Sequence, residues 1–400
     1  MKLLAATAWG VIFLLFSPQA YAVTKILDVR YWSAPDHTRI VLDLSRPASY
    51  EPCAPSDSQT IAWWIKDADF PAREKIVSIN DAVVKSICLQ ATTSHRVRVS
   101  VILVQPAQAR VFALKKYLDK PDRLVIDLLR PDLEGKEKEK RKEIRALKVK
   151  KIRIVVIDPG HGGEDPGTIG ARGTREKDIV LVLGKKLKKI LDQEEDIQAF
   201  LTRKGDYFIS LAERVRIARE YGADLFISLH CNGHRKRHLR GTSVYCLSLK
   251  GASDLAARLL AKKENVSDMI GGVFSEAAPS RILDSILLDL AQTNAINNSL
   301  RLGGIALGEL GEVNTVQFRT PRQAEFAVLK APDFPSILLE CAYLTNSREE
   351  FLLHKTIFQE RLVRAMAESI KKFISTLSAQ EGGVTGVGKS YGTSDHYSLR

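Results

Sequence analysis

The sequence contains few cysteines, and none of them has the spacing of a common cysteine motif. The five in 400 residues are Cys53, Cys88, Cys231, Cys246 and Cys341. Five is too few for a fold held together by disulfides, and without a C-x-x-C spacing the chain has no thiolate zinc site. Export would permit one disulfide, and Cys53 with Cys88 is the natural pair because both belong to one predicted domain. The alternative is that all five are packed apolar side chains.

Long hydrophobic runs are absent after the N-terminus. Residues 1–22 (MKLLAATAWGVIFLLFSPQAYA) combine a basic start, a short apolar run and a small-x-small end. This layout predicts a cleavable signal peptide, with an uncleaved anchor or a buried helix as the alternative. We expect no stable membrane span after cleavage. In an exported chain, the net charge of +13 favours an anionic polymer or surface, and nucleic acid is not expected as a partner.

Two common functional motifs are also missing. The glycine-rich stretch 158–167 (DPGHGGEDPG) matches neither G-x-x-x-x-G-K-[ST] nor G-x-G-x-x-G. Its acidic residues Glu164 and Asp165 would repel a phosphate. The zincin spacing H-E-x-x-H occurs nowhere in the chain. These absences exclude a phosphate loop and a zincin helix, and leave His161 to be explained.

The N-terminal region is predicted to consist of β-strands. Residues 23–133 contain β-rich runs separated by turns, at 38–45, 60–65, 95–103 and 122–129. We predict a small all-β sandwich that serves as a binding module, because no catalytic constellation occurs there. The runs 38–45 (TRIVLDLS) and 122–129 (DRLVIDLL) are similar, which suggests an internal duplication. Residues 134–151 are almost entirely charged and predict a solvated linker, for which a helix is one of the expected conformations.

From residue 152 strands and helices alternate, which predicts an α/β domain with a mostly parallel twisted sheet flanked by helices. Strands are expected at 152–158, 197–202, 224–230, 242–249, 326–330 and 336–346, and helices at 175–192, after Ser210 and up to about Leu377. Ser210 with Glu213 forms a capping box, and Gly222 is placed as a C-cap. A helical insertion is expected at about 250–315. Residues 378–400, rich in Gly and Ser, predict a disordered tail.

Four ionisable residues are expected at one edge of this sheet. Ligands of open α/β sheets bind beyond the carboxyl ends of the strands, where His161, His230 and Glu340 lie. Glu176 is in the first turn of a helix, on its sheet-facing side, four residues before Val180. Two histidines and a carboxylate are the ligand set of a catalytic zinc, and a second carboxylate can take a proton from water. We therefore predict one zinc ion per chain.

Each of these residues also has an ordinary interpretation. His161 can be a turn residue or a hydrogen-bonding histidine, and Glu176 can simply interact with a helix dipole. Glu340 can be a buried carboxylate paired with an arginine such as Arg203 or Arg214. Only the convergence of all four residues on one edge favours the metal site.

Six blocks of sequence resemble the zinc-dependent N-acetylmuramoyl-L-alanine amidases of the cell wall. They are DPGHGG (158–163), TREKD (174–178), LTRKGD (201–206), SLAERVRIAR (210–219), SLHCN (228–232) and LLECAYLTN (338–346). The resemblance covers about 152–377, and it implies zinc ligands His161, Glu176 and His230 with Glu340 as general base. The chain departs from the usual family residues at Cys231-Asn232 and at Cys341-Ala342-Tyr343. Residues 23–133 resemble the AMIN domain of periplasmic members, mainly through TRIVLDLSRPASYE and DRLVIDL.

The resemblance implies hydrolysis of the amide between N-acetylmuramic acid and L-alanine in periplasmic peptidoglycan. Residues 262–273 and 285–303 resemble the regulatory segment of the cell-division amidases. This similarity implies a LytM-type activator, a role in daughter-cell separation, and Glu264 as an autoinhibitory plug; the alternative for Glu264 is a solvated helix residue. We expect a monomer. A zinc hydrolase of another amide or peptide and a non-catalytic murein-binding scaffold are the alternative functions.

Overall fold

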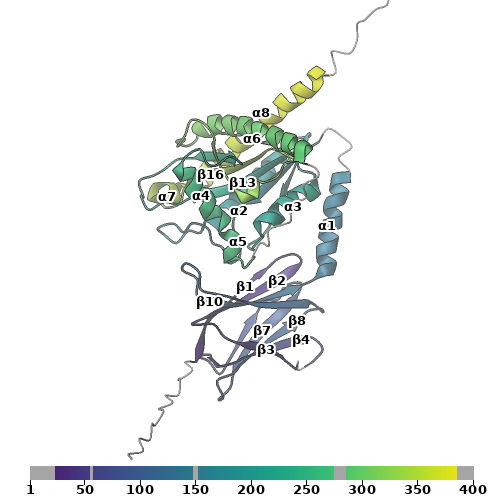
Figure 1. Ribbon diagram of the computed structural model, residues 1–400, viewed down its shortest axis with the longest axis vertical. Helices are drawn as coiled ribbons and strands as arrows, with labels where there is room; N and C mark the ends of the chain where they lie inside the picture. The colour runs from purple at the N-terminus through teal and green to yellow at the C-terminus, as the bar shows by residue number, and fades with distance from the viewer. Residues whose placement is uncertain (1–22, 55–56, 147–151, 274–284, 385–400) are drawn as a thin grey trace, which may run out of the picture. The chain divides into compact units, whose positions relative to one another are not determined.

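The computed structural model describes residues 23–54, 57–146, 152–273 and 285–384 (Figure 1). The predicted signal peptide at 1–22 and residues 385–400 of the predicted tail lie outside the described residues. The chain divides into two compact units, one built from most of residues 23–126 and the other chiefly from 127–384. No helix within the described ranges is long and apolar enough to cross a membrane.

The first unit is the predicted all-β sandwich. Its strands are β1 (Thr24–Ser33), β2 (His37–Leu44), β3 (Tyr50–Cys53), β4 (Thr60–Ile65), β5 (Ala68–Asp69), β6 (Glu74–Ser78), β7 (Val84–Ala91), β8 (Val97–Leu103), β9 (Gln108–Leu114) and β10 (Asp122–Leu129). They form two five-stranded sheets, ordered β5-β1-β2-β10-β9 and β3-β4-β8-β7-β6. The two similar runs noted in the sequence are β2 and β10, which are neighbours in one sheet. Burial alternates along β8, as expected for strands with one face in the core.

The register of the second sheet excludes the expected disulfide. Cys53 on β3 pairs with Ala62 on β4, which pairs with Ser100 on β8, and Ser100 pairs with Cys88 on β7. Three strand spacings separate the two cysteines by about 14 Å. A disulfide requires Cα atoms within about 7 Å, so the predicted pairing is wrong, and both thiols are free.

The second unit is the predicted α/β domain. Its helices are α1 (Pro131–Ala146), α2 (Glu176–Leu191), α3 (Leu211–Tyr221), α4 (Leu255–Asn265), α5 (Ser267–Ile270), α6 (Ser285–Gly311), α7 (Ser347–Leu353) and α8 (Thr356–Val384). Its strands are β11 (Arg153–Pro159), β12 (Ile197–Leu201), β13 (Leu225–Asn232), β14 (Ser243–Leu247), β15 (Arg322–Ala324) and β16 (Ser336–Tyr343). The sheet order is β12-β11-β13-β16-β14-β15, and only β14 runs antiparallel to its neighbour β16.

Helices cover both faces of this sheet (Figure 1). Val155 and Ile157 of β11 point to the face on which α2, α6 and α8 pack, whereas Ile154 and Val156 point to the face under α3 and α4. Such strands, buried on both faces, are typical of parallel sheets. Each large apolar side chain that is fully buried there contributes on the order of 2 kcal/mol.

The structure differs from the sequence predictions in two elements, residues 326–330 and the end of α8. Residues 326–330 are not a strand: Ala327–Leu329 form a 3-10 turn (η2), and the edge strand is β15. A short apolar run packs equally well in a buried turn, so periodicity alone could not decide this. The charged segment agrees with the prediction of a solvated, helical linker, since it contributes most of α1, which has no buried residue. Helix α8 continues beyond Leu377 to Val384.

The predicted caps of α3 are confirmed. The Ser210 hydroxyl accepts a hydrogen bond from the Glu213 N–H at 3.2 Å, and Gly222 adopts φ 70° at the C-cap. Ser210 and Gly222 therefore fix the residues at which α3 begins and ends.

Candidate metal centre

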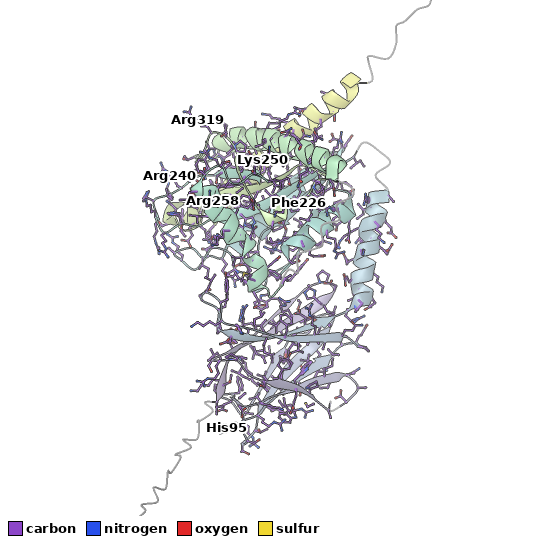
Figure 2. All side chains as sticks on the ribbon, viewed as in Figure 1. His95, Phe226, Arg240, Lys250, Arg258 and Arg319 are labelled. Atoms are coloured by element: carbon purple, nitrogen blue, oxygen red, sulfur yellow. The ribbon has the colours of Figure 1, made fainter. Side chains whose placement is uncertain are left out.

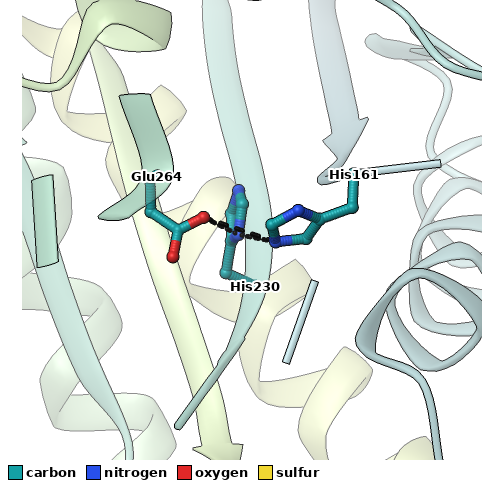
Figure 3. A group of neighbouring side chains, drawn as sticks. All are labelled: His161, His230 and Glu264. Carbon is teal, nitrogen blue, oxygen red and sulfur yellow. Dashed lines mark hydrogen bonds and ion pairs between the residues drawn. The ribbon is translucent and has the colours of Figure 1, made fainter. Parts of the chain in front are cut away.

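Four side chains converge at the carboxyl end of the parallel strands. His161 follows β11, His230 lies on β13, Glu176 opens α2, and Glu264 lies on α4. His161 Nε2 is 3.1 Å from His230 Nδ1. Glu176 Oε1 is 3.0 Å from each of these two nitrogens. Glu264 Oε2 lies 3.3 Å from the His161 nitrogen and 3.2 Å from the His230 nitrogen, and Figure 3 shows its carboxylate turned toward both rings.

These separations suit a tetrahedral metal ion. Zinc–nitrogen and zinc–oxygen bonds of about 2.0–2.1 Å place neighbouring ligand atoms of a tetrahedron about 3.3–3.4 Å apart. His161, His230 and Glu264 are buried and offer ligand atoms that are mutually within 4.8 Å. Nitrogen and carboxylate donors are also the types that zinc prefers. The residues present therefore fit a zinc ion.

Asp165 orients the first histidine. Its Oδ2 lies 2.7 Å from His161 Nδ1, so a proton on Nδ1 is donated to the carboxylate and Nε2 stays free as a ligand atom. Arg214 donates to the His161 carbonyl oxygen at 2.7 Å, which holds the backbone at the positive φ of 60°. Sequence reasoning missed the role of Asp165. The spacing of four residues between His161 and Asp165 is too weak a signal on its own.

Backbone donors fix the carboxylate of Glu176. Its Oε1 accepts from the Cys231 N–H at 2.8 Å, and its Oε2 accepts from the Thr168 N–H at 2.7 Å. Glycines make room for this cluster. A Cβ at Gly160 would lie 2.4 Å from His230 Cε1, and one at Gly167 would lie 2.6 Å from Glu176 Oε2. The glycine-rich loop is therefore needed for the close approach of the backbone to the site.

Glu340 is directly opposite His230 in the register of β13 and β16. Its side chain is completely buried, and neither carboxylate oxygen has a hydrogen-bond partner among the described residues. The alternative that an arginine neutralises Glu340 is wrong. Arg214 instead pairs with Asp158 at 2.8 Å, and Arg203 donates to the carbonyls of Pro159 and Gly160.

The electrostatics of the site favour positive charge between the histidines. Burial alone would lower the pKa of His161, but Asp165 and Glu176 raise it well above its usual range. Burial likewise opposes protonation of His230, yet Glu264 and Glu176 raise its pKa to about 9. Carboxylates that stabilise extra protons on two neighbouring imidazoles would also stabilise a divalent cation there.

The two remaining carboxylates differ in charge state. Burial, together with the nearby charge of Glu176, raises the pKa of Glu340 to about 8. Burial also acts to raise the pKa of Glu264, but Lys263 and His230 hold that pKa well below its usual range. Glu264 is therefore a charged group at the histidines, whereas Glu340 readily accepts a proton near neutral pH.

Comparison with known proteins identifies the family. The profile of the N-acetylmuramoyl-L-alanine amidase family matches residues 155–372, more than half of the 400-residue chain, and the AMIN domain profile matches residues 28–119. The chain belongs to the N-acetylmuramoyl-L-alanine amidase family. It is an amidase that acts on peptidoglycan and carries an N-terminal AMIN domain.

Relatives match the amidase along most of its length. It is 33% identical to the N-acetylmuramoyl-L-alanine amidase AmiC of Escherichia coli O6:H1 over 379 residues, which cover 88% of this chain and 90% of that protein. Identity to AmiC of Neisseria meningitidis serogroup B is 32% over 407 residues, or 93% and 97% of the two chains. The solved structure of AmiC2 of Nostoc punctiforme is 29% identical, covers 56% of this chain and 98% of its own, and has a TM-score of 0.40.

The insertion of the amidase covers the cluster through polar contacts. Lys263 Nζ lies 2.9 Å from Glu264 Oε1 and donates to Thr168 Oγ1 at 3.0 Å. The Ser267 hydroxyl donates to Asp165 Oδ2 at 2.6 Å, and Asp268 Oδ1 accepts from the Leu211 N–H at 2.8 Å. Sequence reasoning named Glu264 but missed Lys263 and Ser267, because only the fold brings them against the glycine-rich loop.

Cys231 and Cys341 are not part of the cluster. Both belong to the core on the opposite face of the sheet, with α2, α6 and α8. Consecutive residues of a strand point to opposite faces, so each thiol lies on the other side from His230 or Glu340. The interpretation of Cys231 as a packed thiol is confirmed, whereas Cys53 and Cys88 are only partly buried.

Proposed function

We propose that the amidase is a zinc enzyme with one ion per chain, held by His161, Glu176 and His230, and with Glu340 as the general base. The arrangement of ligand atoms at 3.0–3.1 Å from one another is the observation that carries this proposal. The orientation of His161 by Asp165 adds the carboxylate–histidine pair that is common behind zinc ligands.

Zinc, when bound, polarises the scissile carbonyl and lowers the pKa of water toward neutrality. Glu340 takes a proton from the attacking water and returns it to the amide nitrogen as the carbon–nitrogen bond breaks. The products are the lactyl carboxylate of N-acetylmuramic acid and the free amino group of L-alanine. The buried, unpartnered carboxylate of Glu340 supports this role, since no described residue competes for its proton.

The test of the zinc proposal is chelation followed by metal return. Purified peptidoglycan incubated with the protein should release stem peptides and leave the glycan strands intact. A chelator should abolish that release, and zinc should restore it. Release that persists in a metal-free sample would contradict the proposal, and cleaved glycosidic bonds would contradict the amidase chemistry itself.

We propose further that Glu264 inhibits the enzyme by occupying the ligand position that the attacking water needs. Glu264 is 4% exposed and charged, and Lys263 neutralises it from the solvent side. Among the described residues of the insertion, only α4 and α5 fit this role. The later part of α6 belongs to the core through Leu302, Ala306, Leu307 and Leu310. Deletion of all of 250–315 would remove that core, so point variants of α4 are the sharper test.

The cellular setting is part of the same proposal. A signal peptide at 1–22 would deliver the protein to the periplasm, where residues 23–133 would bind the wall, 134–151 would link the domains and 152–377 would act on it. A LytM-type activator would withdraw the insertion during daughter-cell separation. We propose a monomer. Mass measurement of the exported protein tests the cleavage site, and a labelled 23–133 segment tests binding to purified sacculi.

A further inference from the structure

Cys231 and Cys341 lie next to each other on the two central strands of the α/β sheet. His230 on β13 is directly opposite Glu340 on β16, and the strands run parallel, so each of these residues is followed by a cysteine (Figure 1). The register shifts after this pair, and the two thiols are nevertheless in contact, because the Cys231 thiol is hydrogen-bonded to the Cys341 side chain. Neighbouring strands are about 4.8 Å apart, within the range of about 4.4–6.8 Å that a disulfide requires between Cα atoms.

Both thiols are on the face of the sheet away from the metal cluster. Cys231 and Cys341 belong to the core formed with α2, α6 and α8, and both are 0% exposed. The strand that carries Cys231 is central in the sheet, and Figure 2 shows Phe226, near its start, in the interior of the second unit. A bond between the two thiols would therefore join the strands of His230 and Glu340 without entering the site.

The other three cysteines do not offer such a pair. Cys53 and Cys88 are separated by two intervening strands. The register of β14 with β16 places Cys246 opposite Ile337, four residues before Cys341. Four residues span about 13 Å along a strand, which is too far for a disulfide. Of the five cysteines, which all lie within the described residues, one pair alone is placed to form a disulfide.

We propose that an oxidant of the disulfide class joins Cys231 and Cys341 in a disulfide bond while the exported chain folds, and that this bond stabilises the two central strands. The structure shows the reduced state, in which both thiols are free. Neither thiol is exposed in the folded chain, so the bond forms before the sheet is fully packed and is then protected from reductants. Export, on which this inference rests, is part of the function proposed above and would supply the oxidising compartment.

The bond forms by thiol–disulfide exchange. One cysteine, as its thiolate, attacks the disulfide of the oxidant, which gives a mixed disulfide and releases one thiol of the oxidant. The second cysteine then displaces the other thiol of the oxidant, and the bond between the two protein sulfurs is formed. Both cysteines lose their protons, and the oxidant takes up the two electrons because its own disulfide is reduced to two thiols.

The first experiment maps the bond in the full-length chain. The protein is made by cell-free synthesis with either oxidised or reduced glutathione, and thiols that remain free are alkylated under denaturing conditions. Trypsin releases Cys231 in the peptide 220–235 and Cys341 in the peptide 331–348, and neither peptide contains another cysteine. Mass spectrometry should find these peptides linked in the oxidised sample and separate in the reduced one. Alkylation of both cysteines in the oxidised sample, or bonds from either to another cysteine, would overturn the proposal.

The second experiment measures thermal unfolding of the same two samples. The oxidised protein should have a Tm about 5–15 °C above that of the reduced protein, as expected for a disulfide that closes a loop on the order of 100 residues. Cys341→Ala should abolish this difference, and Cys231→Ala is the second variant in case the first does not fold. The matched control is Cys246→Ala, which removes a buried thiol of the same core and should keep both the link and the difference in Tm.

Linked peptides without a difference in Tm would overturn the stabilising role. A difference in Tm that persists in Cys341→Ala or Cys231→Ala would assign the effect of the oxidant to other residues and would also overturn the proposal. Neither experiment measures hydrolysis, zinc content or export, so failure of the disulfide and failure of the proposed function are distinct results.

Discussion

The glycine-rich loop beneath the metal cluster and the helices that cover the cluster are held in different ways. Two buried arginines hold the loop at 158–167 by donating to its carbonyl oxygens and to Asp158. The cover, α4 with α5, packs Ala257, Leu260 and Ala261 of α4 into the core and is otherwise held by polar side chains, while Leu255 and Leu259 are 64% and 58% accessible. A segment that is fixed by several buried hydrogen bonds resists local unfolding, whereas a short segment with few apolar contacts unfolds locally at a low cost in free energy. We call the loop the holder and α4 with α5 the cover; release of the cover is part of the proposal made above for Glu264.

The largest effect on turnover is expected from Glu340 on β16, the proposed general base. Glu340→Gln should lower turnover by about 10²–10⁴-fold, because proton transfer to the carboxylate is lost. Zinc content, measured by mass spectrometry under native conditions, should not change. Loss of the metal in this variant would make Glu340 a ligand and contradict its assignment as base.

The next effect tests how firmly the loop is held. Arg214→Met should reduce the free energy of unfolding by about 3–5 kcal/mol, because Asp158 would remain as a buried, unpaired charge. Denaturant titration measures this change, and zinc titration of the folded fraction should show weaker binding. Arg219→Met, on an exposed pair of the same helix, is the control and should change the stability little.

A smaller effect of opposite sign is expected from the cover. Glu264→Ala should increase basal peptidoglycan hydrolysis about tenfold, because the charged group that competes for the ligand position is removed. Lys263→Met should act in the same direction, since it removes the cation that pairs with Glu264. Glu325→Ala, an exposed change outside the cover, is the control. Reduced hydrolysis in a folded Glu264→Ala protein would make Glu264 part of the catalytic machinery.

The smallest effect is expected in the pH dependence of the free energy of unfolding, through Asp158 in the holder. Burial acts to raise the pKa of Asp158, but Arg214, Thr202 and Ser228 outweigh it and lower that pKa. A lowered folded-state pKa adds stability above the unfolded value of about 3.9, and this stability is lost as the pH falls through the folded value. Unfolding measured between pH 7 and pH 3 should therefore show a steeper acid loss in the unmodified protein than in Asp158→Asn. Equal slopes would show that Asp158 does not contribute.

The sequence alone determined much of the second unit. Apolar runs in the sequence mark its buried strands, and Ser210 and Gly222 mark the two ends of α3. The predicted strand ends place His161, His230 and Glu340 at one edge of a parallel sheet. These features follow from local periodicity, from capping chemistry and from the rule that parallel strands share a carboxyl edge. The six blocks of similarity point to the same edge.

Only the tertiary structure decided which groups face one another. It separates Cys53 from Cys88 by two intervening strands, and turns 326–330 into a buried 3-10 turn. It also brings Lys263 and Ser267 against the glycine-rich loop, about 100 residues away in the chain. Such contacts depend on strand order and register, which arise from packing over the whole domain. Neighbouring residues in the chain carry no local signal for them, so the sequence could place His161, His230 and Glu340 at one edge of the sheet but could not predict the groups that contact them.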